Sequence, residues 1–119
     1  MKAYSILIGS PNATRRFARR DERVLQVIAA RHFPGGFTIM DAKGAWYDAR
    51  RRSFRKEEAR QLLVCTNKPR KLAACCRELG TAMRQQELLV FPLGAARRFV
   101  MGNVPRSRAR VRAASGRAG

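Results

Sequence analysis

The chain has 119 residues, of which 45% are hydrophobic, so it has the size of one domain with a single core and excludes two full domains. It carries 26 Lys and Arg against 8 Asp and Glu, a formal net charge of +18, which predicts a polyanionic partner. No apolar run approaches the roughly 20 residues of a membrane-spanning helix and no signal-peptide cleavage site follows the start, so we expect a cytoplasmic protein without a membrane partner.

The first two predicted elements are a strand over residues 2–8 and a helix that ends near His32. The strand residues alternate between two faces, and the Gly-Ser-Pro-Asn sequence of residues 9–12 ends this pattern. Apolar residues then recur at helical spacing, with Thr14 or Asp21 as the predicted N-cap. The Phe-Pro-Gly-Gly sequence that follows ends the helix.

Two further strands with an exposed connection are predicted in the middle of the chain. Residues 37–48 return to a period of two, and we expect Gly44 to form a β-bulge in this second strand. Residues 49–56 are rich in Arg, which predicts an exposed connection with hairpin geometry. Residues 58–66 form a short continuous apolar run, which is typical of a central strand covered on both faces.

The last predicted elements are a second helix and a fourth strand. Asn67 is the expected N-cap, because a Pro follows in the first turn, and the apolar spacing continues through Gly80. Residues 87–93 form a strand that Pro92 limits to an edge or a strand end. We also expect the apolar residues 99–101 to pack back on the body.

The order strand, helix, strand, strand, helix, strand predicts an α+β ferredoxin-like βαββαβ sandwich, with a four-stranded antiparallel sheet and both helices on one face. We assign residues 1–101 to this domain. Residues 102–119 combine Arg with small residues and lack acids, which predicts a disordered basic tail. Two helices leave one face of the sheet open, so we also expect a homo-oligomer.

Residues 32–46 resemble a stretch in an uncharacterised bacterial family, which reads Arg-Phe-Pro-x-Gly-Leu-Thr-Val-x-Asp-x-x-Gly-x-Trp (RFPxGLTVxDxxGxW). The specific positions in this chain are Phe33, Pro34, Gly36, Thr38, Asp41, Gly44 and Trp46. A looser match extends from Ile6 to about Val90, while His32 stands where the family often has Arg, and the basic tail is extra. The resemblance implies a ferredoxin-like fold and brings no activity.

The predicted layout is also similar to that of PII-type signalling proteins, whose trimers hold nucleotides between subunits. The likeness is at the level of the fold, because the sequence has no nucleotide signature. It implies an alternative function as a small-molecule or nucleotide-binding regulator.

Metal, cofactor and thiol chemistry have little support in the sequence. The chain has one His and no C-x-x-C spacing, so we expect no metal site and no cofactor. The three cysteines, Cys65, Cys75 and Cys76, lie in apolar surroundings and are expected to be reduced core thiols. A nucleophilic Cys65 would need a base, and nothing in the sequence links it to His32.

Two other segments allow more than one interpretation. Asp41 and Asp48 flank the expected bulge. One of them could act as an acid or base in a small oligomeric α+β-barrel enzyme. The alternative is that both accept hydrogen bonds in turns and form ion pairs with nearby Arg. Residues 9–14 at a strand-to-helix junction, with Arg15 and Arg16 adjacent, suit either a weak phosphate site or an ordinary turn.

The arginines give the main functional hypothesis, a non-enzymatic module that binds nucleic acid or another polyanion. Exposed aromatic residues for base stacking are few near the basic clusters: Trp46, Tyr47 and Phe54. The alternative is that these arginines form an ordinary solvated surface with a compositional bias to Arg and bind no partner. The candidate binding residues comprise an expected stripe on the first helix (Arg16, Arg20 and Arg23), the connection (Arg50, Arg51, Arg52, Arg55 and Lys56) and the tail (Arg106, Arg108, Arg110 and Arg112).

Overall fold

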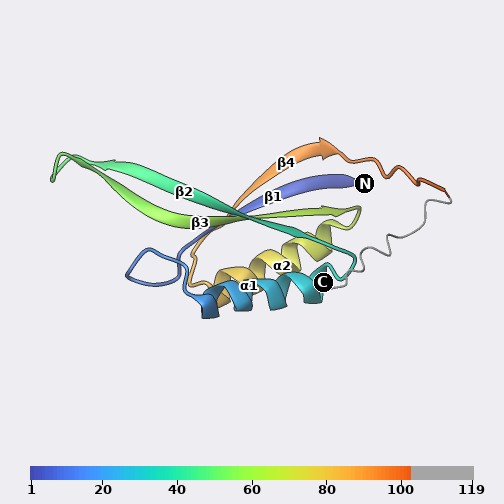
Figure 1. Ribbon diagram of the computed structural model, residues 1–119, viewed down its shortest axis with the longest axis horizontal. Coiled ribbons are helices and arrows are strands. Elements are labelled where there is room, and N and C mark those ends of the chain that lie inside the picture. Colours follow the sequence, from blue (N-terminus) through green and yellow to red (C-terminus); the bar gives the residue numbers. More distant parts are fainter. Residues whose placement is uncertain (103–119) are drawn as a thin grey trace, which may run out of the picture.

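The computed structural model describes residues 1–102 and contains six elements in the predicted order (Figure 1). They are β1 (Lys2–Gly9), α1 (Arg19–His32), β2 (Thr38–Asp48), β3 (Ser53–Thr66), α2 (Pro69–Ala82) and β4 (Leu89–Ala95). The tail residues Arg106, Arg108, Arg110 and Arg112 lie outside the described residues, and so does nearly all of the predicted tail. Neither helix in the described part of the chain is long and apolar enough to cross a membrane.

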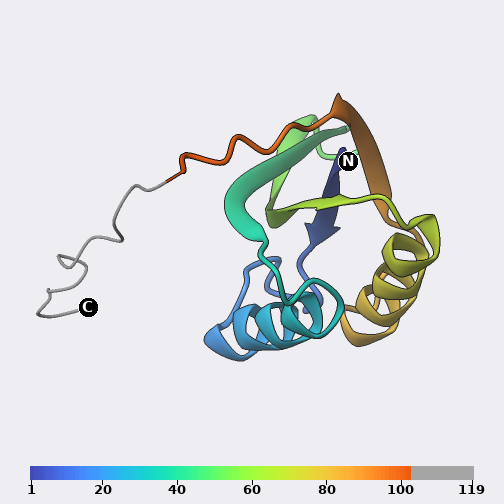
Figure 2. The ribbon, with the colours of Figure 1, turned by 90° about the vertical axis from the view of Figure 1, so that its right-hand side faces the viewer.

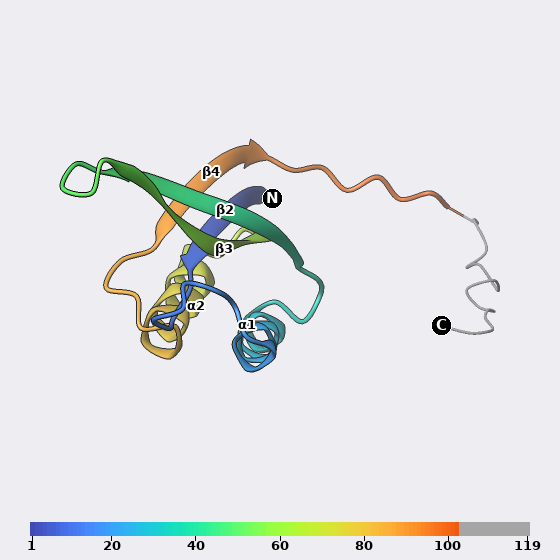
Figure 3. The same cartoon turned by 60° about the vertical axis from the view of Figure 1, so that its left-hand side comes forward.

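The four strands form one antiparallel sheet in the order β2-β3-β1-β4. Both helices cover the same face of this sheet, and the other face is left open (Figures 2 and 3). We call the second surface the open face. The predicted ferredoxin-like sandwich is therefore confirmed.

The core lies between the sheet and the helices. Because side chains alternate along a strand, Ile6 and Ile8 of β1 point to the helices together with Leu62 and Val64 of β3, and all four are buried. The helices contribute a second layer to the same cluster: Leu25, Ile28, Ala29, Cys75 and Leu79. Full burial of such aliphatic side chains contributes about 1.5–3 kcal/mol each, so this layer is the main source of stability.

The start of α1 differs from the prediction that made Arg16 part of the helix. Asp21 stands at the third helical position, and its Oδ2 accepts the Ala18 backbone N–H at 2.8 Å. This bond satisfies a donor at the helix end and fixes the start at Arg19, so Arg16 lies in the preceding loop. The N-cap is Ala18, so the predicted N-cap is wrong for both Thr14 and Asp21, although the Asp21 side chain does bond to the N-cap backbone.

The start of α2 also differs by one residue from the prediction. Lys68, and not Asn67, is the N-cap, and Pro69 occupies the first turn. The Thr66 hydroxyl accepts the Lys68 backbone N–H at 3.0 Å and so shapes the entry to the helix from β3. The helix runs through Gly80 as predicted.

The predicted bulge at Gly44 is wrong. The pairing of β2 with β3 is continuous from Thr38 with Leu63 to Asp48 with Ser53, so no residue is skipped at Gly44. The irregularity lies on the other side of the sheet, where the pairing of β1 with β4 shifts between Ala3 and Tyr4.

Two burial predictions are also wrong. The side chains of residues 99–101 are 72–83% exposed and do not pack back on the body, because β4 ends at Ala95 and the chain then leaves the sheet. Cys65 is exposed, because it pairs with Ala3 on the open face, whereas Cys75 is buried under the sheet.

Candidate polyanion-binding hairpin

The β2–β3 hairpin is the most prominent feature of the molecule. Its two strands pair along all 11 residues of β2, and its tip extends well beyond the helices (Figure 1). The tip therefore has no helix packed on it. Side chains near the tip are available to a partner on both faces of the ribbon.

Asp48 organises the turn that carries the arginines. Its Oδ1 accepts the backbone N–H of Arg50 at 3.0 Å and of Arg51 at 3.3 Å, which is a usual role of Asp in turns. Arg52 completes the turn with a φ of 51°. The side chains of Arg50, Arg51 and Arg52 are exposed, so the turn presents three guanidinium groups in sequence.

Two aromatic rings lie next to these cations. Tyr47 and Phe54 are a cross-strand pair, and their rings meet edge to face with 5.4 Å between centroids. Tyr47 is 55% exposed and Phe54 is 69% exposed, so the pair contributes little to a core. Trp46, one residue before Tyr47, is also exposed and alternates to the opposite face of the ribbon.

The remaining predicted hairpin residues lie behind the tip. Arg55 pairs with Trp46 and is half-buried, and Lys56 pairs with Ala45 and is exposed. The five predicted basic residues of the connection thus all lie on one hairpin, which we call the basic hairpin: Arg50, Arg51, Arg52, Arg55 and Lys56. The strand β3 begins at Ser53, so part of the predicted connection is strand.

The structure does not bring Arg16, Arg20 and Arg23 into one stripe. All three are exposed. Each lines a different depression: Arg16 faces the base of the hairpin, Arg20 the end of α2, and Arg23 the groove beside Phe37. They add positive charge to the surface without forming a joint site.

The two candidate acid–base residues have structural partners. The Asp41 carboxylate lies 3.3 Å from Nε of Arg60 and is highly exposed. Asp48 accepts the turn hydrogen bonds described above, and its Oδ2 lies 3.9 Å from Nε of Arg51. Both residues therefore match the interpretation as hydrogen-bond acceptors and ion-pair partners of Arg.

The β1–α1 loop is held largely by its own polar side chains. Ser10 Oγ donates to the Arg16 carbonyl at 2.8 Å, and Asn12 Nδ2 donates to Asp21 at 2.9 Å. On its other side the loop contacts β3, where Oε1 of Glu58 accepts the Phe17 backbone N–H at 2.7 Å. The Asp21 carboxylate accepts the Ala18 backbone N–H at the N-terminus of α1, so it places a negative charge where an anion would bind.

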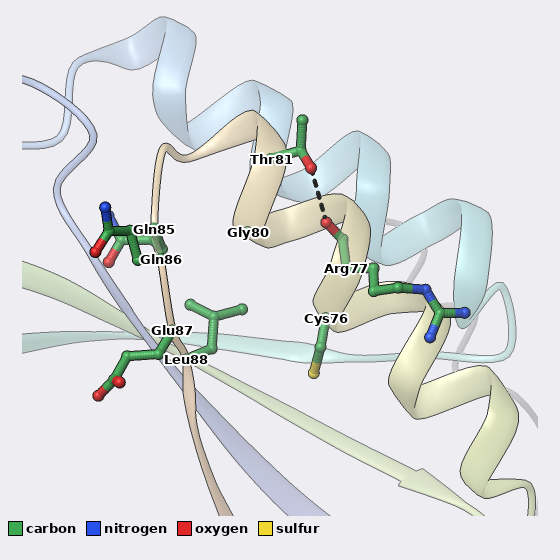
Figure 4. Close-up of a pocket in the computed structure, with 8 residues that line it drawn as sticks. All are labelled: Cys76, Arg77, Gly80, Thr81, Gln85, Gln86, Glu87 and Leu88. Atoms are coloured by element: carbon green, nitrogen blue, oxygen red, sulfur yellow. Dashed lines mark hydrogen bonds between the residues drawn. The ribbon is translucent and has the colours of Figure 1, made fainter.

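A pocket of about 320 Å³ lies between α2 and the segment that leads to β4 (Figure 4). Cys76 points into it, and Gly80 forms its wall close to the backbone of Gln85. Burial raises the pKa of the Cys76 thiol, which keeps it protonated and makes it a poor nucleophile. Among residues 1–102, no group of His, Cys, Asp and Glu gathers that would hold a metal ion.

The open face has apolar side chains that the sequence analysis did not assign individually. Phe91 of β4 pairs with Ser5 of β1, and Leu89 pairs with Leu7, so all four point away from the helices. Met40 points the same way from β2. Leu89, Phe91 and Met40 are 39–54% exposed. The sequence does show alternating apolar residues at 89 and 91. Their assignment to the open face, however, requires the register between β4 and β1.

No protein-family model and no curated protein matches the chain. Solved structures do match. A phage SAM lyase in complex with S-methyl-5'-thioadenosine has a TM-score of 0.53 and 16% identity over 79% of this chain and 89% of the other. CutA from Synechococcus elongatus has a TM-score of 0.51 and 13% identity over 80% of both chains. These likenesses establish a shared fold.

Proposed function

We propose that the protein is a non-enzymatic, small oligomeric module that binds nucleic acid or another polyanion through the basic hairpin. The observation that carries the proposal is the combination on one projecting ribbon of five basic residues with three exposed aromatic rings. Cations contact phosphates irrespective of sequence, and aromatic rings stack on bases. A surface that was merely biased to Arg would not need exposed rings beside the cations.

The aromatic pair favours a single-stranded nucleic acid over other polyanions. Tyr47 and Phe54 are accessible from outside, and unpaired bases offer the π-faces that such rings bind. The tail residues Arg106, Arg108, Arg110 and Arg112 stay in the proposal as additional phosphate contacts. Three free thiols agree with a reducing compartment such as the cytoplasm, which we propose as the location.

For the oligomer we propose a second copy of the chain on the open face. Phe91, Leu89 and Met40 are large apolar residues that one copy leaves in water, and their burial between copies is favourable. The hairpin tip also extends beyond β1 and β4 (Figure 1), so an interface built on the open face around β4 leaves the arginines of the turn free for a polyanion.

The alternative functions, a PII-like nucleotide-binding regulator or a small α+β-barrel enzyme, have weaker support. The similar structures establish the fold and carry no ligand over to this chain. Of the candidate acid–base residues, Asp41 forms an ion pair with Arg60, and Asp48 accepts a backbone hydrogen bond in the hairpin turn. If nucleic acid did not bind, a thermal-shift assay with ATP and with S-methyl-5'-thioadenosine would test these alternatives.

Fluorescence anisotropy with a labelled single-stranded oligonucleotide tests the proposal. The test variant is Arg50→Ala, Arg51→Ala, Arg52→Ala. The matched control also removes three cations, but from the exposed surface around α2: Lys68→Ala, Arg70→Ala, Arg77→Ala. We expect the test variant to lose at least tenfold in affinity and the control less than threefold. Equal losses would mean that only net charge matters, and no binding by the natural chain would refute the proposal.

A further inference from the structure

A second basic site lies at the base of the hairpin, where the β1–α1 loop meets β2 and β3. It is a pocket of about 640 Å³. Its lining comes from three segments: residues 14–16, residues 43–45 and residues 56–58. The loop is fixed there, because the Arg15 carbonyl accepts the backbone N–H of Glu58 at 2.8 Å. The pocket is thus built from parts of the chain that the fold holds together.

Arg15 is the lining residue whose side chain has the most informative contacts. Its backbone has a φ of 60°, which is rare for a residue with a side chain, and the Asn12 carbonyl accepts its N–H at 3.1 Å. Its guanidinium lies over the Trp46 ring, with 4.7 Å between Cζ and the ring centroid. Such stacking holds a guanidinium in place and leaves its in-plane donors free for an acceptor.

One donor of Arg15 lacks an acceptor. Nη1 is buried, and no hydrogen-bond acceptor for it is found among residues 1–102. Buried donors in folded proteins nearly always have a partner, so an orphaned guanidinium nitrogen in a pocket wall indicates a bound acceptor. Because Arg15 also lines the pocket, an acceptor bound there would lie next to its side chain.

The charge of the pocket specifies the kind of acceptor. Arg15 is joined there by three more cations, Arg16, Lys43 and Lys56, and opposed by Glu57 and Glu58. The lining therefore has a formal excess of two positive charges. The Glu58 carboxylate already accepts the Phe17 N–H at 2.7 Å. A phosphate group carries about −1.5 to −2 charges at pH 7 and several acceptor oxygens, which complements this lining.

We propose that this pocket binds a single phosphate group, with Arg15 as the principal ligand and Lys43 and Lys56 as supporting cations. The site is distinct from the tip of the hairpin, where the three turn arginines contact a polyanion from outside. The phosphate group has more than one possible source: inorganic phosphate, a small phosphomonoester or the phosphorylated end of an oligonucleotide. The proposal does not depend on nucleic-acid binding at the tip.

Trp46 provides a direct readout, because it is the only tryptophan in the chain and it contacts Arg15. The experiment titrates the full-length protein with inorganic phosphate and follows tryptophan emission, with sodium chloride at matched ionic strength as the reference. We expect a saturable change with phosphate. Arg15→Gln should weaken the apparent Kd at least tenfold. Arg19→Gln, an exposed cation outside the pocket, should leave it within twofold of the natural chain.

A response to chloride equal to that of phosphate, or an unchanged Kd in Arg15→Gln, would overturn the proposal. Should Arg15→Gln fail to fold, the exposed pair Lys43→Gln, Lys56→Gln replaces it, with at least a fivefold loss expected. The variant Arg50→Ala, Arg51→Ala, Arg52→Ala should keep phosphate binding, which separates this site from the tip. Oligonucleotides with a 5'-phosphate or a 5'-hydroxyl distinguish a nucleic-acid end from free phosphate as the source.

Discussion

The Tyr47 and Phe54 rings pack edge to face across the β2–β3 pair, with 5.4 Å between their centroids, at a position where no helix covers them. Such a pair stabilises a hairpin modestly, by about 0.5–1.5 kcal/mol. Both rings stay more than half exposed. Together with the adjacent arginines they give the hairpin both positive charge and exposed aromatic faces, the two features on which the proposed binding of single-stranded nucleic acid depends.

Replacement of Phe54 tests the aromatic part of this surface. Phe54→Ala should lower the affinity for single-stranded oligonucleotide about tenfold, since stacking on one base contributes about 1–3 kcal/mol. Phe54→Tyr keeps a ring and should bind within twofold of the natural chain. Fluorescence anisotropy gives both values. If Phe54→Ala bound as tightly as the natural chain, the ring would have only a structural role.

Arg60 should contribute to stability. Its Nε lies 2.8 Å from the Glu22 carboxylate, its guanidinium lies over the Phe17 ring, and its side chain is only 12% exposed. Arg60→Ala should lower the free energy of unfolding by about 2 kcal/mol, because a hydrogen bond to a charged partner is lost from a largely buried site. Urea denaturation measures this. Arg77→Ala, on the exposed face of α2, should change the free energy of unfolding by less than about 0.5 kcal/mol. An equal loss in the two variants would contradict a stabilising role of Arg60.

The thiols should differ in reactivity. Burial, with a smaller contribution from neighbouring Cys76, raises the pKa of Cys75 to about 12, so very little thiolate exists at pH 8. Cys65 is exposed. Iodoacetamide labelling of dilute native protein, read by peptide mass spectrometry, should modify Cys65 first and Cys75 only after urea is added. Labelling of both at one rate in native protein would show that the region around α2 opens readily.

Phe91→Lys should disrupt self-association, because it places a charge among the apolar residues of the open face. Sedimentation velocity should show a smaller species for this variant. Phe99→Lys is the matched control, since Phe99 is 75% exposed and lies beyond β4. An unchanged sedimentation coefficient for Phe91→Lys would place the interface elsewhere. Because Cys65 also lies on the open face, its labelling in the natural chain should slow as protein concentration rises.

Local pattern was sufficient to predict most of the fold. Alternation placed Ile6 and Ile8 on one face, and the Pro after Phe33 marked where α1 ends. The errors came where pairing with a neighbouring strand decides the structure of a segment. Residues 53–57 are mostly polar, yet they form strand because each pairs with a residue of β2. Gly44 likewise has regular strand pairing, because it lies opposite Glu57 of β3.

The candidate site was predictable in its charges and not in its geometry. The arginines of the hairpin were evident as a cluster in the sequence. The contact between Arg15 and Trp46 was not, because it joins residues far apart through the pairing of a loop with β3. The sequence predicted that one face of the sheet is open. Which residues of β4 lie on that face depends on the register between β4 and β1, and alternation in the sequence does not supply this register.

The salt dependence of oligonucleotide binding tests the central claim most directly. If the hairpin and tail engage four to six phosphates, log K should fall with log salt at a slope of roughly −3 to −5. The variant Arg50→Ala, Arg51→Ala, Arg52→Ala should have a slope smaller by about 2–3, with its melting temperature nearly unchanged because exposed charges contribute little to folding. Absence of binding at about 50 mM salt, or a slope that the variant leaves unchanged, would contradict the assignment of the basic hairpin as the binding surface.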